Sequence, residues 1–116
     1  MSRWIHALRL WRGVLVLMLG AVLYLALAPN PPQSGTLGWD KLNHVLAFVA
    51  LGSVARLGVV RPWPWIATAL LGFGGLIELL QMLTPTRSAE WADLLADALG
   101  IAIGLMLATW WRDRAL

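Results

Sequence analysis

Residues 40–48, DKLNHVLAF, place an acid, a base, an amide and an imidazole within five positions at the start of an apolar segment. Asp40 and His44 are four residues apart, and Lys41 and His44 are three apart. A helix would therefore bring these three side chains to one face. The apolar residues continue to about residue 60 and end before the turn-forming RPWP. The stretch predicts a helix with its polar groups gathered at one end.

The composition of the whole chain indicates that lipid is its solvent. Of 116 residues, 59% are hydrophobic and 13% are charged, whereas soluble domains are roughly 45–50% apolar. A core of this length cannot hide so much apolar surface from water. The absence of cysteine excludes disulfides, thiolate metal sites and cysteine nucleophiles. We therefore expect one small membrane domain.

Four apolar segments predict four transmembrane helices. Each is close to the roughly 20 residues that cross a hydrocarbon core. Prolines and turn residues separate them, as in PNPPQSG from residue 29 and TPTR from residue 84. The predicted fold is an all-α polytopic membrane protein with a compact four-helix bundle. The predicted helices cover about residues 10–28, 42–60, 65–83 and 92–111.

The basic residues predict how this bundle is oriented. One side of it collects Arg3, Arg9, Arg12, Arg56, Arg61, Arg112 and Arg114, whereas the other side receives only Lys41 and Arg87. By the positive-inside rule, both termini lie in the cytoplasm of a bacterial inner membrane. Residues 1–12 then form a basic cytoplasmic segment, residues 13–111 the membrane domain and residues 112–116 a cytoplasmic tail. This orientation accounts for the pI near 10.7, so we expect no nucleic-acid partner.

The first apolar segment has a second interpretation, as a secretory signal peptide. Arginines precede it, and Ala26-Leu27-Ala28 resembles a small-residue cleavage site. The proline that follows directly argues against cleavage. In either case the remaining three helices keep their predicted orientation.

The acidic residues are concentrated on the predicted extracytoplasmic side, and their spacing places several on one face. Along the last helix, Glu90, Asp93, Asp97, Gly100 and Gly104 follow one another at steps of three, four, three and four. Such steps form one continuous stripe. The two glycines form a small-xxx-small pair that lets another helix approach closely, either within the chain or in a second copy of a homo-oligomer.

A close helix partner would bring this stripe toward the polar groups of the other helices. Glu78 and Gln81 are three residues apart and share one side of the third helix near its end. An approach of the second or third helix would carry the carboxylates toward Lys41, His44 and Glu78. The sequence therefore predicts a shared polar cluster, although it does not fix which helices pack together.

The ordered set of polar residues resembles the VanZ-like family of small bacterial membrane proteins. It covers about residues 38–104, and the chain departs from the family pattern at Asp97, usually Asn, and at Phe48, often Tyr. The resemblance implies a role in the cell envelope, because the family is named after a member associated with reduced sensitivity to teicoplanin. The set comprises Asp40, Lys41, His44, Phe48, Glu78, Gln81, Arg87, Glu90, Asp93, position 97 and Gly100.

Three functions of the cluster remain open at this point. It could be a structural network that locks helix ends together. It could bind a membrane lipid or a lipid-linked envelope molecule, with Lys41 and Arg87 as donors to phosphate or carboxylate. It could also be catalytic, with His44 as general acid or base on a lipid headgroup, oriented by Asp40 or Glu78; Asp93 is a further catalytic candidate.

Two other functions are less favoured by the sequence. Asp40, His44, Glu78 and Asp93 offer metal-compatible groups, but one histidine without cysteine argues against zinc, so we predict no metal and no cofactor. A small proton-coupled carrier would resemble known exporters in having an acid within the first helix. Residues 13–28 carry no charge.

Overall fold

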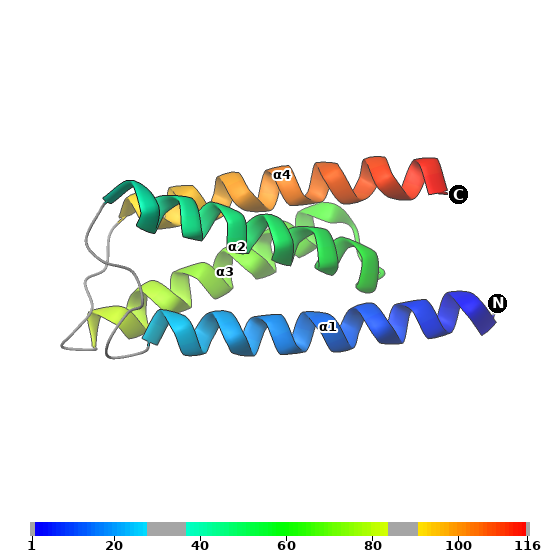
Figure 1. The fold of residues 1–116 in the computed structure, drawn as a ribbon, viewed down its shortest axis with the longest axis horizontal. Coiled ribbons are helices and arrows are strands. Elements are labelled where there is room, and N and C mark those ends of the chain that lie inside the picture. The colour runs from blue at the N-terminus through cyan, green and yellow to red at the C-terminus, as the bar shows by residue number, and fades with distance from the viewer. Residues whose placement is uncertain (1, 28–36, 84–90, 116) are drawn as a thin grey trace.

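The computed structural model describes residues 2–27, 37–83 and 91–115 of the chain. Within these ranges every long segment is helical, which confirms the predicted all-α fold. The helices form a compact bundle in which successive helices run in opposite directions, and the two chain ends lie at the same end of it (Figure 1). The helices are α1 (Ser2–Leu27), α2 (Leu37–Gly58), α3 (Trp63–Met82) and α4 (Trp91–Ala115).

Several helices extend beyond the limits expected from hydropathy. α1 already begins at Ser2, so the basic residues Arg9 and Arg12 belong to the same helix as the apolar segment. α2 begins before Asp40, and α4 continues through Arg112. The reason is that a helix ends at backbone breakers and not at charged residues, and no proline interrupts these extensions.

Three of the four helices are long and apolar enough to cross a membrane, judged by length and composition within the described residues. They are the stretches His6–Leu27, Trp63–Met82 and Trp91–Arg114. α2 falls outside those limits because Lys41, Asn43 and His44 near its start and Arg56 near its end lower its hydropathy. A membrane protein is thus supported, whereas four crossings and cytoplasmic termini stay predictions.

α2 and α4 are in direct backbone contact through glycine. A Cβ atom added at Gly100 would lie 2.5 Å from the carbonyl oxygen of Val45, and one at Gly104 would meet the carbonyl oxygen of Val49. Gly52 of α2 faces α4 in return, because a Cβ atom added there would lie 3.1 Å from the carbonyl oxygen of Ile101. The small-xxx-small pair therefore packs within the chain, with α2 as its partner.

The core lies where α2, α3 and α4 meet, and α1 covers it from one side. Phe48, Leu51, Ile66, Ile77 and Ile101 are almost fully buried there. α1 contributes half-buried side chains such as Leu15, Leu19 and Val22 to this core. It lies on the opposite side of α2 and α3 from α4 (Figure 1).

Arginine side chains hydrogen-bond to the C-terminal end of α2, at the end of the bundle that holds both termini. Arg12 of α1 donates from Nε to the carbonyl oxygen of Gly58 at 2.7 Å. Arg112 of α4 donates from Nη1 to the carbonyl oxygen of Arg56 at 3.2 Å. Both bonds satisfy carbonyls at the C-terminal end of α2, where cations are also favoured by the helix dipole.

Candidate functional site

The end of the bundle opposite the chain termini carries a second group of polar side chains. There α2 and α4 begin and α3 ends, so three helices contribute to one location (Figure 1). Its described members are Lys41, His44, Glu78, Asp93 and Asp97, which we call the acidic cluster.

The imidazole of His44 lies between two carboxylates of α4. Its Nδ1 is 2.7 Å from Oδ1 of Asp97, which is a hydrogen-bond distance. Its Nε2 is 3.6 Å from Oδ2 of Asp93, which is close enough for an ion pair but long for a hydrogen bond. Because Asp93 and Asp97 are one helical turn apart, they can hold one ring from two sides.

Asp93 also pairs with Lys41, one turn before His44 on the same face of α2. The distance between Lys41 Nζ and Asp93 Oδ1 is 2.9 Å. The side chain of Lys41 is 30% exposed, whereas that of Asp93 is only 4% exposed. The carboxylate of Asp93 is therefore shared between a partly buried imidazole and an ammonium group that reaches the surface.

Asp97 is the most deeply buried member of the acidic cluster, with a relative exposure of 0%. Its Oδ1 binds His44, but its Oδ2 has no hydrogen-bond donor within the described part of the chain. A Cβ atom at Gly74 of α3 would lie 2.6 Å from this Oδ2. Gly74 therefore makes room for an oxygen whose burial is energetically costly.

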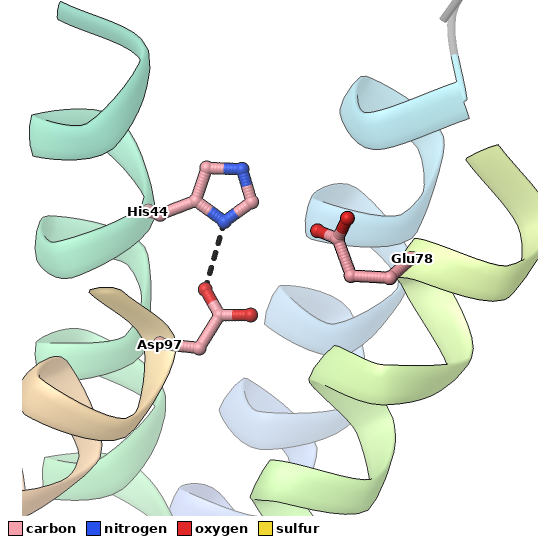
Figure 2. Close-up of side chains that lie close together, drawn as sticks. All are labelled: His44, Glu78 and Asp97. Carbon is pink, nitrogen blue, oxygen red and sulfur yellow. Dashed lines mark hydrogen bonds and ion pairs between the residues drawn. The ribbon is translucent and has the colours of Figure 1, made fainter. Parts of the chain in front are cut away.

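Glu78 enters from α3 and completes the convergence of three helices. Figure 2 shows its carboxylate pointing toward His44 and Asp97, which lie on α2 and α4. One nitrogen or oxygen from each of these three residues lies within 4.8 Å of the others. The cluster thus brings together groups that are 34 and 19 residues apart in sequence.

The remaining predicted site residues do not all join this cluster. Gln81 donates from Nε2 to the carbonyl oxygen of Ala26 at 3.0 Å, so it ties α3 to the end of α1. The side chain of Asp40 and the whole of Arg87 and Glu90 lie outside the described residues.

The described cluster has an excess of negative charge. Three carboxylates face one lysine and one histidine, so with all three carboxylates ionised the sum is −1 when His44 is protonated and −2 when it is neutral. A site of this charge can hold a cation or accept hydrogen bonds from ammonium, amide and hydroxyl groups.

Comparison with known protein families assigns the four helices to one family. The VanZ/LLP1 family model matches residues 8–112, which include every described residue of the acidic cluster. The chain belongs to the VanZ/LLP1 family. This confirms the resemblance seen in the ordered polar residues. Searches of curated proteins and of solved structures gave no significant match.

Two features of the VanZ/LLP1 site go beyond what the sequence indicated. The sequence predicts that Asp40 or Glu78 orients His44, whereas the structure shows a hydrogen bond between His44 and Asp97. Gly74 faces Asp97, whereas its neighbours Gly72 and Gly75 have nothing within 4 Å of an added Cβ atom. The four-residue step from Asp93 to Asp97 is the signal that could have revealed the first feature. No sequence signal distinguishes Gly74 from Gly72 or Gly75.

Proposed function

We propose that this protein binds the polar headgroup of an envelope lipid or lipid-linked precursor at the acidic cluster. Through this binding it modulates envelope properties and susceptibility to glycopeptide-type or amphiphilic agents. It does so as a multi-pass protein of the bacterial inner membrane. The observation that carries the proposal is Asp97, which lies in a cluster of excess negative charge. It is fully buried, and within the described residues only one of its two carboxylate oxygens has a hydrogen-bond partner.

The surroundings of the cluster suit an amphiphilic ligand. Large apolar side chains on α3 and α4 near this end are exposed, among them Leu79, Met82 and Leu95. In a membrane these side chains face acyl chains. A ligand with a polar head and an apolar tail could place its head in the cluster and its tail along these helices.

The donors and acceptors define which headgroups fit. The carboxylates of Asp93, Asp97 and Glu78 accept hydrogen bonds from ammonium, amide or hydroxyl groups. The partly exposed Lys41 offers one donor to a phosphate or carboxylate at the rim. Headgroups that carry both an amine or hydroxyl group and an anionic group match this arrangement best.

The test compares substituted proteins for abundance, ligand binding and phenotype. His44→Gln and Asp93→Asn should leave the protein in the membrane but reduce the amount of co-purified envelope lipid seen by native mass spectrometry. They should also change sensitivity to a glycopeptide and to detergent. Asp113→Asn is the matched control, because Asp113 is an exposed acid on α4. Unchanged lipid binding and unchanged sensitivity in both variants would remove the proposal.

A catalytic role on a lipid headgroup is the second candidate. The 2.7 Å contact between His44 and Asp97 is the arrangement in which a carboxylate orients a histidine general base. Against it, the other ring nitrogen faces Asp93. Turnover of purified envelope lipids that disappears in His44→Ala would favour this candidate over simple binding.

A further inference from the structure

We propose that His44, Glu78 and Asp97 form a binding site for one divalent transition-metal ion of the Zn²⁺ or Mn²⁺ type. This site goes beyond the proposed headgroup binding and does not depend on it. It also differs from the expectation of no metal, which rested on the presence of one histidine and the absence of cysteine. The argument begins with the convergence of one ligand atom from each of three helices.

The three side chains come from different helices and lie close together. Figure 2 shows the carboxylate of Glu78 facing the imidazole of His44 and the carboxylate of Asp97 across the space between α3 and the α2–α4 pair. Their candidate ligand atoms lie within 4.8 Å of one another. An ion with ligands at about 2.0–2.2 Å places those ligands about 3–3.5 Å apart. A shift of at most about 1.3–1.8 Å, mainly in the flexible Glu78 side chain, closes that difference.

Asp97 supplies a second and independent indication of a ligand. Its side chain is fully buried, and its Oδ2 lacks a hydrogen-bond donor within the described ranges. Leaving a buried carboxylate oxygen without a hydrogen bond is energetically unfavourable in an apolar medium. A metal ion would satisfy that oxygen and offset its charge. The lack of a side chain at Gly74 leaves room for this oxygen, since an added Cβ atom would lie 2.6 Å from it.

The contact between His44 and Asp97 already brings two of the three ligand groups together. Nδ1 of His44 and Oδ1 of Asp97 lie 2.7 Å apart, so an ion that replaces the proton between them would meet one nitrogen and one carboxylate ligand. Ligating histidines in metal sites are oriented by a carboxylate at their other ring nitrogen. Asp93 lies 3.6 Å from Nε2 and can take that role.

The donor set and the charge select the class of ion. One imidazole nitrogen with two carboxylate oxygens suits first-row divalent ions such as Zn²⁺ and Mn²⁺. Mg²⁺ and Ca²⁺ prefer ligand shells made of oxygen alone. Two positive charges also match the surplus of one or two negative charges in the acidic cluster.

The experiment uses the full chain, stripped of metal in detergent micelles and dialysed separately against Zn²⁺, Mn²⁺ and Mg²⁺. Elemental analysis of the retained metal should give one Zn²⁺ or Mn²⁺ per chain and no stoichiometric Mg²⁺. Glu78→Gln keeps the size of the side chain and should weaken binding by roughly 100-fold, since it replaces a charged carboxylate ligand with a neutral amide. Asp113→Asn, which removes an exposed carboxylate of α4, should retain wild-type affinity.

Two results would overturn the site. One is the absence of a stoichiometric ion in the wild-type protein, and the other is equal retention by wild type and a folded Glu78→Gln. If Glu78→Gln does not elute as a folded species, Asp97→Asn serves as the second variant, with the same 100-fold loss expected and equal retention counting against the site. Headgroup binding is measured on metal-free and metal-loaded protein in parallel. Headgroup binding without a metal removes only this inference, and metal binding without a headgroup removes only the proposed function.

Discussion

His44 and Asp97 are 53 residues apart in the chain and meet at 2.7 Å between Nδ1 and Oδ1. The contact joins α2 to α4 at the end of the bundle that carries the acidic cluster. It converts two polar groups that are unfavourable in lipid into partners for each other. The packing of the two helices and the chemistry of the acidic cluster therefore depend on each other.

Substitutions at Asp97 should separate the hydrogen bond from the charge. Asp97→Asn retains an acceptor for His44 and removes a buried charge, so we expect stability to change by less than about 1 kcal/mol. Asp97→Ala removes the acceptor and leaves a cavity, which should cost about 2–3 kcal/mol. Unfolding in mixed micelles measures both values. Equal destabilisation by Asn and Ala would show that the hydrogen bond is not what Asp97 contributes.

The backbone contact between α2 and α4 makes a prediction about glycine. In Gly104→Ala the new methyl group would meet the carbonyl oxygen of Val49, so the helices must move apart. Overpacking of this kind costs about 1–3 kcal/mol. Gly72→Ala on α3 is the matched control, because nothing lies within 4 Å of its added Cβ atom. If thermal unfolding shows the two variants to be equally stable, the close contact is not a source of stability.

Gly74 and Gly75 provide a similar pair beside the acidic cluster. The methyl group of Gly74→Ala would press on Oδ2 of Asp97 at 2.6 Å, whereas the methyl group of Gly75→Ala enters open space. We expect Gly74→Ala to lower stability by about 1–3 kcal/mol and to disturb the His44 ring resonances in an NMR spectrum. Gly75→Ala should leave those resonances in place. Undisturbed His44 resonances in Gly74→Ala would argue against the tight fit around Asp97.

The ion pair of Lys41 with Asp93 should contribute less than the buried contacts. Lys41 is partly exposed, so solvent screens its charge, and Lys41→Met should cost about 1 kcal/mol or less. The same unfolding assay in micelles measures this cost. A loss above about 3 kcal/mol would mean that the pair behaves as a fully buried one.

The orientation in the membrane is tested with reporter fusions after residues 36, 61, 88 and 116. Cytoplasmic signals are expected after 61 and 116, and periplasmic signals after 36 and 88, because the arginines gather at the end that holds both termini. A periplasmic signal after residue 61 or 116 would contradict this topology.

Much of the fold could be predicted because apolar segments and prolines determine where helices form. The stripe from Asp93 to Gly104 could also be predicted, since residues at steps of three and four share one helix face. The helix that packs against this stripe could not be predicted, because the contact of Gly100 with Val45 depends on how whole helices pack. For the same reason the hydrogen bond of Gln81 to the end of α1 could not be derived from spacing alone.

The polar start of α2 has a consequence for the order of events during synthesis. Lys41 and His44 receive their described carboxylate partners from Asp93 and Asp97, which the ribosome adds about fifty residues later. Until α4 emerges, α2 is a weakly apolar segment whose charged end lacks those two partners. We therefore expect α2 to stay in contact with the translocon or with the already inserted α1 until α4 has been made. α2 and α4 should then enter the lipid together. A chain truncated before α4 should be removed by membrane proteases.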